Sequence, residues 1–544
     1  MELKLSVPPL TTRVIVEVEL DPAKLRSWLA ALPLLNVAET GNKLFSSLSI
    51  HNRVAIEPQR RVELLELYRY PVQQLSLEFE KQYLGLPLPL TEKFKSIAER
   101  NRQFKLEMAI GYKRALLDSK PPEKPRELEK FRQHQAHIVE RAIHYLTGAL
   151  AVSYHAYAPY PLGTWHEIHT LFNYAESLDA TDLPLEDDRH RDAPVATVSR
   201  AYCHALLLDL SDPYHLPPRM IDRIHQYLGR WAGLARLLPA TGQFDPTCQF
   251  LVQQSEDRSG IVYTGETALQ EPGQFRLLNT VDLARLIHTQ LSALQRRETV
   301  DTEGLDPDFF GSDGQELLVR LIHTWGVHPK RMFRRNARPG GRVELCVGLN
   351  AVNFWLNGGT RFTVSSTFVG PLPQRTQLGP NVNHRREDVP PEFLYSVWDV
   401  EDEGAGGMSL LQQGAATHPV RVGEVVAARI SGDSAWRIAV LRWVKSAGPN
   451  NVDIGLQWTA PKAQAVMVKT FTDEGHESDF LPAVLLPEVP ALKQPKMLVV
   501  PRGVYKPDRV FYLDDGYQLN RARITRPSEI SHSFERFLFD IEPV

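Results

Sequence analysis

A cluster of arginines is the part of this 544-residue chain best suited to bind a ligand. Between Lys330 and Arg342, five of thirteen positions are arginine: Arg331, Arg334, Arg335, Arg338 and Arg342. A guanidinium is planar and always charged, so it can donate two parallel hydrogen bonds to a phosphate or to the O6 and N7 atoms of a guanine. Such a cluster is by itself more often a solvated or ion-paired segment than a binding site, so its interpretation as a site for a phosphate-bearing ligand depends on a second motif.

A second polar motif follows later in the chain, between two apolar stretches. It begins at Asp402 and continues with Gly404, Gly406 and Gly407. The carboxylate of Asp402 could accept hydrogen bonds from the N–H groups of a guanine. Glycine has no Cβ, so we expect these positions to allow close approach of a ligand and to supply positive φ angles in the turn.

These two motifs, in this order, resemble those of the PilZ superfamily, whose barrel domains bind the second messenger cyclic di-GMP. The family pattern has an Arg-x-x-x-Arg loop before the first barrel strand and an Asp/Asn-x-Ser-x-x-Gly turn in a later strand. Asp402, Gly404 and Gly407 match the second motif, and Gly455 would be the glycine of a later strand. The resemblance covers residues 328–460 and implies an antiparallel β-barrel that binds cyclic di-GMP.

The resemblance also implies that two arginines four positions apart hold the ligand. Three such pairs are present: Arg331 with Arg335, Arg334 with Arg338, and Arg338 with Arg342. We expect the pair of Arg334 and Arg338 first, and Arg331 and Arg335 next. The ligand-binding residues implied are Arg331, Arg334, Arg335, Arg338, Asp402, Gly404 and Gly407.

The chain departs from the family pattern at Gly404, where the family has serine. A missing hydrogen bond of this kind costs about 0.5–1.5 kcal/mol, which would weaken binding without abolishing it. The same departure leaves open a second interpretation, in which a degenerate barrel has lost its ligand and serves as a scaffold that docks proteins.

The order of helical and strand patterns predicts an α+β protein of several domains. Apolar residues at helical spacing recur through the first part of the chain, and strand-like runs separated by turn residues fill the rest. We expect a helical bundle or stack of helical hairpins over 1–326, either as one domain or split near 180–195. A PilZ-like β-barrel should follow over 327–460. The last segment, 461–544, should form a second β-rich unit or complete the first barrel.

Four local patterns give sharper expectations. Pro71 should kink or split the helix that passes through it. A helical pattern covers 218–238, and a strand-rich pattern covers 342–356. Asp515 and Gly516 have the sequence of a hairpin turn.

Composition restricts the class of protein. The net charge is −3, so no global field attracts nucleic acid or anionic lipid. Cys203, Cys248 and Cys346 are far apart in the sequence, which indicates a reducing compartment rather than a disulfide framework. The N-terminus lacks the pattern of a secretory signal, and no apolar run reaches the ~18 residues of a membrane span. We therefore expect a cytoplasmic protein.

No pattern of a catalytic or metal site is present. His166 and His169 are three positions apart, whereas a zincin helix needs two histidines four apart. The motifs of phosphate-binding loops, hydrolases and dinucleotide enzymes are missing from the sequence, so we expect no enzyme, no metal and no cofactor. Binding of RNA or single-stranded DNA by the arginine loop is an alternative that the net charge disfavours.

The expected function is therefore that of a cyclic di-GMP receptor. Its ligand would order the arginine-rich loop by neutralising it, and the helical region would pass the signal to a protein partner.

Overall fold

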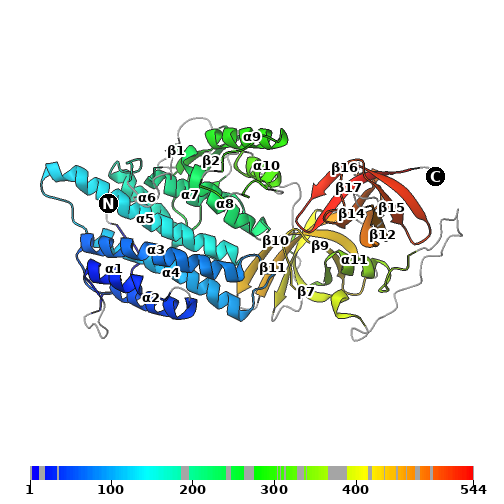
Figure 1. Ribbon diagram of the computed structural model, residues 1–544, viewed down its shortest axis with the longest axis horizontal. Helices are drawn as coiled ribbons and strands as arrows, with labels where there is room; N and C mark the ends of the chain where they lie inside the picture. The colour runs from blue at the N-terminus through cyan, green and yellow to red at the C-terminus, as the bar shows by residue number, and fades with distance from the viewer. Residues whose placement is uncertain are drawn as a thin grey trace. The chain divides into compact units, whose positions relative to one another are not determined.

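The computed structural model contains two compact units, which we describe separately (Figure 1). The first comprises Met1–Leu86, Leu90–Pro213 and Pro218–Lys330, and the second comprises Pro87–Pro89, Tyr214–Pro217 and Arg331–Val544. The structure describes residues 3–542 except 12–18, 34–35, 186–194, 218, 241–244, 246, 263–274, 303, 307, 312–313, 327–335, 338–339, 365–388, 414–418, 434, 449–450, 461, 472–477 and 491–493.

The first unit is mainly helical, as the sequence predicts. Its α-helices are α1 (Pro22–Ala30), α2 (Val37–His51), α3 (Pro58–Tyr83), α4 (Glu92–Asp118), α5 (Leu128–His155), α6 (Thr164–Ser177), α7 (Val198–Leu210), α8 (Met220–Trp231), α9 (Val281–Gln295) and α10 (Gly314–Gly326). Several begin at a side-chain cap: the Asp21 carboxylate accepts from two backbone N–H groups of α1, and Thr197 accepts from the N–H of Arg200.

Pro71 does not split its helix, so of the two expected effects, a kink or a split, the split is excluded. Helix α3 runs from Pro58 to Tyr83 with Pro71 inside it. An interior proline removes one hydrogen bond and crowds the preceding turn. The buried stripe on either side of it, which includes Tyr68, Val72 and Leu75, holds the helix together because tertiary packing supplies most of a helix's stability.

A small sheet interrupts the helices, and the patterns did not predict it. The strands β1 (Arg236–Pro239), β2 (Gln249–Gln253), β3 (Ile261–Val262) and β4 (Phe275–Asn279) pair in the order β1-β4-β2-β3. The helix expected over 218–238 therefore ends at Trp231, because residues from Arg236 onward pair with β4 instead.

The second unit starts with a closed six-stranded antiparallel barrel, which confirms the expected PilZ-like fold. Its strands are β6 (Arg342–Val347), β7 (Ser396–Gly404), β8 (Gly407–Gln413), β9 (Val425–Ile430), β10 (Arg437–Gly448) and β11 (Asn451–Ala460). They follow the order β7-β6-β9-β10-β11-β8, and pairing of β8 with β7 closes the barrel. A short strand, β5 (Asn336–Ala337), pairs with Asp402 and Glu403 of β7, beyond the residues of β7 that pair with β6.

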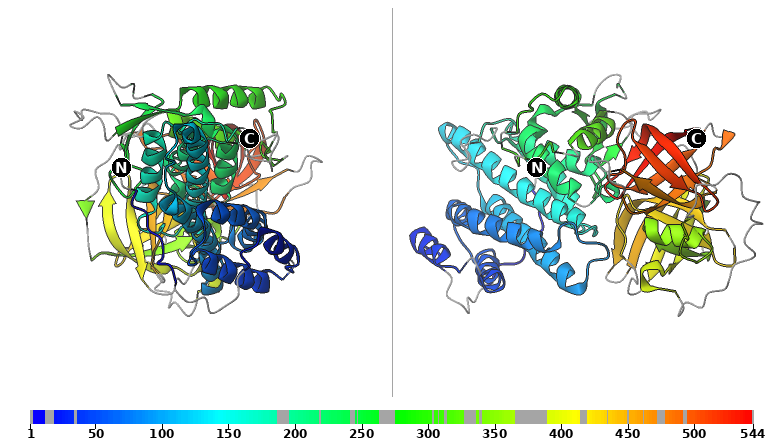
Figure 2. Two further views of the ribbon diagram at one scale, coloured as in Figure 1. Left: turned by 90° about the vertical axis from the view of Figure 1, so that its left-hand side faces the viewer. Right: turned by 45° about the vertical axis from the view of Figure 1, so that its right-hand side comes forward.

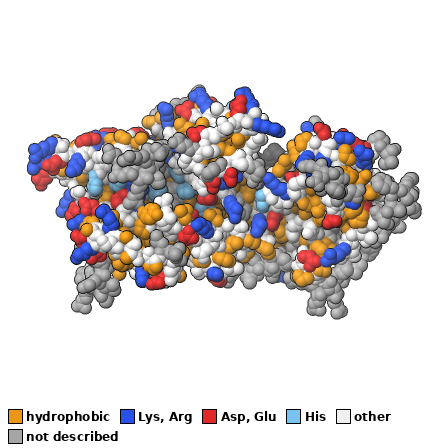
Figure 3. Space-filling view, in the orientation of Figure 1, with side chains coloured by type: hydrophobic (Ala, Val, Ile, Leu, Met, Phe, Trp, Pro, Cys, Tyr) orange, Lys and Arg blue, Asp and Glu red, His pale blue; other side chains and the backbone are white. Residues whose placement is uncertain are grey.

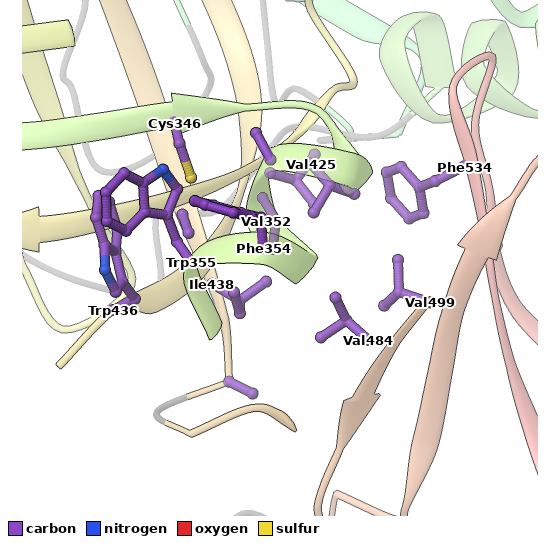
Figure 4. Close-up of a cluster of buried hydrophobic side chains, with 14 of the residues drawn as sticks. Cys346, Val352, Phe354, Trp355, Val425, Trp436, Ile438, Val484, Val499 and Phe534 are labelled. Carbon is purple, nitrogen blue, oxygen red and sulfur yellow. The ribbon is translucent and has the colours of Figure 1, made fainter. Parts of the chain in front are cut away.

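A helix replaces the second half of the strand-rich segment expected over 342–356. The chain leaves β6 at Val347, passes through Gly348 with a φ of 88°, and enters α11 (Leu349–Leu356). Periodicity alone cannot distinguish a short apolar helix from a buried strand. Here Val352 and Trp355 of α11 pack in one cluster with residues of both barrels (Figure 4).

The last segment closes a barrel of its own and does not complete the first (Figure 2). Its strands are β12 (Gln464–Thr470), β13 (Leu481–Leu486), β14 (Met497–Pro501), β15 (Val510–Asp514), β16 (Leu519–Ile530) and β17 (Phe534–Ile541), in the order β12-β13-β14-β17-β16-β15. The turn predicted at Asp515 and Gly516 connects β15 with β16, and Gly516 has a φ of 84°. Asn353 of α11 donates to the carbonyl oxygens of Val466 and Ala483, at 2.8 Å each.

Candidate site on the outer wall of the first barrel

The acidic motif forms the hairpin between β7 and β8. Asp402 lies opposite Ser409, and Gly404 lies opposite Gly407. The Asp402 carboxylate accepts a hydrogen bond from the backbone N–H of Ser409 at 3.2 Å. A β-bulge at Glu401 precedes this pair, so the strand bends where the predicted ligand-binding residues begin.

One glycine of this hairpin, Gly407, is needed for close packing, and no glycine of the motif is needed for an unusual backbone angle. None of Gly404, Gly406 and Gly407 has a positive φ, which corrects the expectation from sequence. A Cβ at Gly407 would lie 1.9 Å from the carbonyl oxygen of Leu456 in β11. The neighbouring strand therefore excludes any larger residue at Gly407.

The segment that carries the arginine cluster pairs with this hairpin. Arg331, Arg334, Arg335 and Arg338 lie outside the residues that the structure describes. Between them, Asn336 pairs with Glu403, and Ala337 pairs with Asp402. The backbone between Arg335 and Arg338 therefore runs antiparallel to the strand that contains Asp402.

A row of residues across three strands continues from Asp402. Ser409 lies opposite Asp402 and Gly455, and Gly455 lies opposite Trp443. Residues directly opposite one another share a face of a sheet. The alternate row is fully buried inside the barrel and consists of Val400, Leu410, Ile454 and Val444. The row from Asp402 to Trp443 therefore belongs to the outer wall.

Trp443 lies over Gly455. A Cβ at Gly455 would be 1.8 Å from the indole Nε1 atom, so only glycine leaves room for the ring. Sequence reasoning selected Gly455 but missed Ser409 and Trp443. A glycine inside a strand marks close approach of another group, so a search for the residue opposite Gly455 could have found the tryptophan.

The wall beside this row is acidic. Asp453 lies opposite Leu411 of β8 and Lys445 of β10. Burial, and secondarily repulsion from Glu401, raises the pKa of Asp453 to about 6, although Lys445 opposes the shift. Among the described residues, the Oδ1 atom of Asp453 has no hydrogen-bond partner.

Of the two histidines that were considered as metal ligands, His169 has structural partners for both ring nitrogens. The ring nitrogens of His169 bond the hydroxyl of Tyr202 at 2.6 Å and the carbonyl of Arg258 at 2.8 Å. Burial lowers the pKa of His169 to about 4. In the part of the chain that the structure describes, no group of three or more His, Cys, Asp or Glu side chains could hold a metal ion.

Three models of one protein family match the chain in succession. The N-terminal domain of the cyclic-di-GMP receptor FimW matches residues 23–241, its middle PilZ domain matches 249–369 and 380–465, and the FimW C-terminal beta-barrel domain matches 466–541. The chain belongs to the FimW family of cyclic-di-GMP receptors.

A curated relative agrees over the whole length. The cyclic-di-GMP receptor FimW of Pseudomonas aeruginosa is 24% identical over 593 residues, which cover 100% of this chain and 94% of the relative. No solved structure matches the chain. The PilZ resemblance is therefore confirmed, and the C-terminal model of the FimW family covers β12–β17, the strands of the second barrel.

The middle PilZ model begins at residue 249, whereas the second compact unit begins its main span at Arg331. Between these positions lie α9 and α10, which precede the arginine cluster in the sequence. Among the described residues, no helix is both long and apolar enough to cross a membrane.

Proposed function

We propose that this chain is a non-enzymatic receptor that binds cyclic di-GMP on the outer wall of its first barrel. The observation that carries the proposal is the pairing of Ala337 with Asp402, because the arginine-bearing segment and the acidic hairpin then share one edge of the barrel. The residues that we propose for ligand binding are Arg331, Arg334, Arg335, Arg338, Asp402, Gly404 and Gly407.

The proposed chemistry follows from the ligand, which has two phosphates and two guanines. The arginines would donate to phosphate oxygens and to guanine O6 and N7. Asp402 would accept from guanine N–H groups. The indole of Trp443, in the same row, is half-buried, and its centroid lies 6.3 Å from that of the His215 ring. A base that stacks on the exposed part of the indole would gain about 1–3 kcal/mol.

The proposed signal is neutralisation of the arginines in residues 330–342, a segment in which Asn336 and Ala337 pair with β7. Clustered guanidinium groups repel one another, and the two ligand phosphates would neutralise them and strengthen the attachment of the segment to the barrel. This segment follows α10 in the sequence and leads into β6. We propose that this change is passed to the helical region, which binds a protein partner.

Isothermal titration of the full chain with cyclic di-GMP tests the proposal, with cyclic di-AMP as the control ligand. We expect saturable binding of the guanine dinucleotide and much weaker binding of the adenine one, because adenine offers an amino group where guanine offers O6. No heat with cyclic di-GMP at low salt and tens of micromolar protein would remove the receptor proposal.

One observation favours a second candidate function. The PilZ pattern has a serine at the position of Gly404, so the hydroxyl of that serine is missing here. Loss of this hydroxyl is what we would expect in a barrel that no longer binds its ligand. Such a scaffold would dock the same protein partners with and without cyclic di-GMP, which a pull-down with and without the dinucleotide distinguishes.

Nucleic-acid binding has no comparable support. On the face that Figure 3 displays, the described basic and acidic side chains of the helical unit are interspersed rather than gathered in one basic field.

A further inference from the structure

An ion-pair network joins the two barrels close to the proposed site. Arg442 of β10 donates to both carboxylate oxygens of Glu529 of β16, at 2.7 and 3.4 Å. Arg536 of β17 lies 2.9 Å from the same carboxylate. One glutamate of the second barrel therefore neutralises an arginine from each barrel.

Arg442 occupies a special position in its strand. The pairing of β10 with β11 shifts between Leu441 and Trp443, which leaves Arg442 as the extra residue of a β-bulge. Its Nε atom donates to the side-chain oxygen of Gln457 at 2.6 Å. Gln457 in turn lies opposite Gly407. Arg442, which directly precedes Trp443, thus connects Glu529 of the second barrel with Gln457, the residue opposite the hairpin end of β8.

Two members of the network are shielded from solvent, whereas Arg442 is 36% exposed. The side chains of Glu529 and Arg536 are only 18% and 17% exposed. Burial lowers the pKa of Arg536, against the opposing effect of Glu529. Surface ion pairs contribute little, but removing one partner of a shielded network leaves the remaining charges unpaired. Without Glu529, Arg442 and Arg536 would be neighbouring like charges.

We infer that Glu529 of the second barrel is a positioning residue for the ligand-binding wall of the first, because it holds Arg442 in the bulge and thereby fixes Trp443 over Gly455. This inference rests on the proposed function, and it gives the second barrel a role in ligand binding. Glu529 need not contact the ligand itself. It acts through Arg442, whose bulge sets the direction of the neighbouring indole.

Titration calorimetry of the full chain with cyclic di-GMP tests the inference. We expect Glu529→Gln and Arg442→Gln each to weaken binding by about tenfold, and the double variant to be no weaker than either, because all three break one network. Glu542→Gln is the matched control: Glu542 pairs with Arg521 and Arg523 within the second barrel. It should bind as the wild type does.

A second readout separates positioning from loss of stability. The near-ultraviolet circular dichroism of Trp443, isolated by subtracting the spectrum of the matching Trp443→Phe variant, should weaken in Glu529→Gln without ligand and stay unchanged in Glu542→Gln. If Glu529→Gln destabilises the fold, Arg442→Lys serves as a second variant. Lysine keeps the positive charge but lacks the two parallel N–H donors of the guanidinium, so Arg442→Lys should show the same weakening of the Trp443 signal.

The possible failures are distinguishable. Normal affinity and an unchanged Trp443 signal in Glu529→Gln would overturn the inference and leave the receptor proposal intact. Absence of binding in the wild type would overturn the receptor proposal. Additive losses of affinity in the double variant would show that Glu529 and Arg442 do not act together, which also overturns the inference.

Discussion

The two barrels have the same architecture, but they use their polar side chains differently. On the outer wall of the first barrel, Ser409 Oγ and Asp453 Oδ1 have no hydrogen-bond partner among the described residues. In the second barrel, the Nε atom of Arg536 also has no such partner, but the buried carboxylates are satisfied: Glu535 accepts from the backbone N–H groups of Gly503 and Tyr505, and Asp514 accepts from that of Gly516. Buried polar groups are normally satisfied, so unsatisfied ones that gather on one wall indicate a functional surface, whereas satisfied ones indicate a structural role.

The charges follow the same division. Carboxylates accumulate on the first barrel beside β5, and one of them, Asp453, has a raised pKa. In the second barrel, Arg521 and Arg523 form ion pairs with a single carboxylate, Glu542. The comparison implies that matched substitutions should alter ligand binding in the first barrel and only stability in the second, with Glu529 as the exception because it pairs with Arg442 of the first barrel.

The largest effect should come from the arginine cluster. We expect the double variant Arg334→Ala/Arg338→Ala to lose at least about a hundredfold in affinity for cyclic di-GMP, since each charged hydrogen bond contributes about 1.5–3 kcal/mol. The matched control in the second barrel is Arg521→Gln/Arg523→Gln, which should bind normally in the same titration. Normal binding by Arg334→Ala/Arg338→Ala would refute the assignment of the binding site but would leave the description of the fold unchanged.

A glycine in each barrel gives the next test. Gly455→Ala must displace the indole of Trp443, which should destabilise the chain by about 1–3 kcal/mol and also weaken ligand binding. Gly503, with a φ of 91° and no atom within 4 Å of an added Cβ, is the control. Gly503→Ala should lower the melting temperature without changing the dissociation constant. Equal binding by both variants would separate Trp443 from the ligand site.

Restoring the hydroxyl of the family pattern should have a smaller effect of opposite sign. We expect Gly404→Ser to strengthen binding of cyclic di-GMP by about 0.5–1.5 kcal/mol, because Gly404 has no positive φ that would exclude a side chain. Titration of this variant beside Gly404→Ala isolates the hydroxyl from the Cβ. A gain shared by both variants would assign the effect to the backbone.

The smallest effect concerns pH. The pKa of Asp453 is about 6 in the folded chain against an ordinary value of 3.8, so the folded state binds more protons between these values. The contribution of Asp453 to stability therefore falls as pH rises from about 4 to 6. Asp453→Asn should raise the melting temperature at pH 7 relative to the wild type, and raise it less at pH 4.5.

Removing the neighbouring charge sharpens this test. Glu401→Gln should lower the pKa of Asp453, since Glu401 repels its ionised form. In the melting profile of Glu401→Gln, the fall in stability with rising pH should therefore occur at a lower pH than in the wild type. Identical profiles for the wild type and Glu401→Gln would contradict the electrostatic explanation.

Local patterns were sufficient where the evidence lay within one element. The apolar stripes predicted most helices of the first unit, and the change to strand patterns near 340 located the barrels. The spacing of Asp402, Gly404 and Gly407, with the arginines before them, was sufficient to indicate the family. These signals can be read from the sequence because helix and strand periodicity, turn residues and motif spacing all depend on residues that are close together in the chain.

The sequence failed where distant segments decided the local structure. Pro71 lies in an unbroken helix because packing on both sides supports it. Residues 349–356 form a helix because two barrels surround them, and residues 236–239 form a strand because β4 lies beside them. In each case burial or pairing outweighed the local preference.

By itself, the sequence determined the kinds of residue available for a dinucleotide and their order along the chain. Only the tertiary structure decided which of them meet, because strand register is set by pairing between segments that are far apart in sequence. That register aligned Asp402, Ser409, Gly455 and Trp443 across one wall and brought Ala337 beside Asp402. It also placed Glu529 of the second barrel against the bulge beside Trp443.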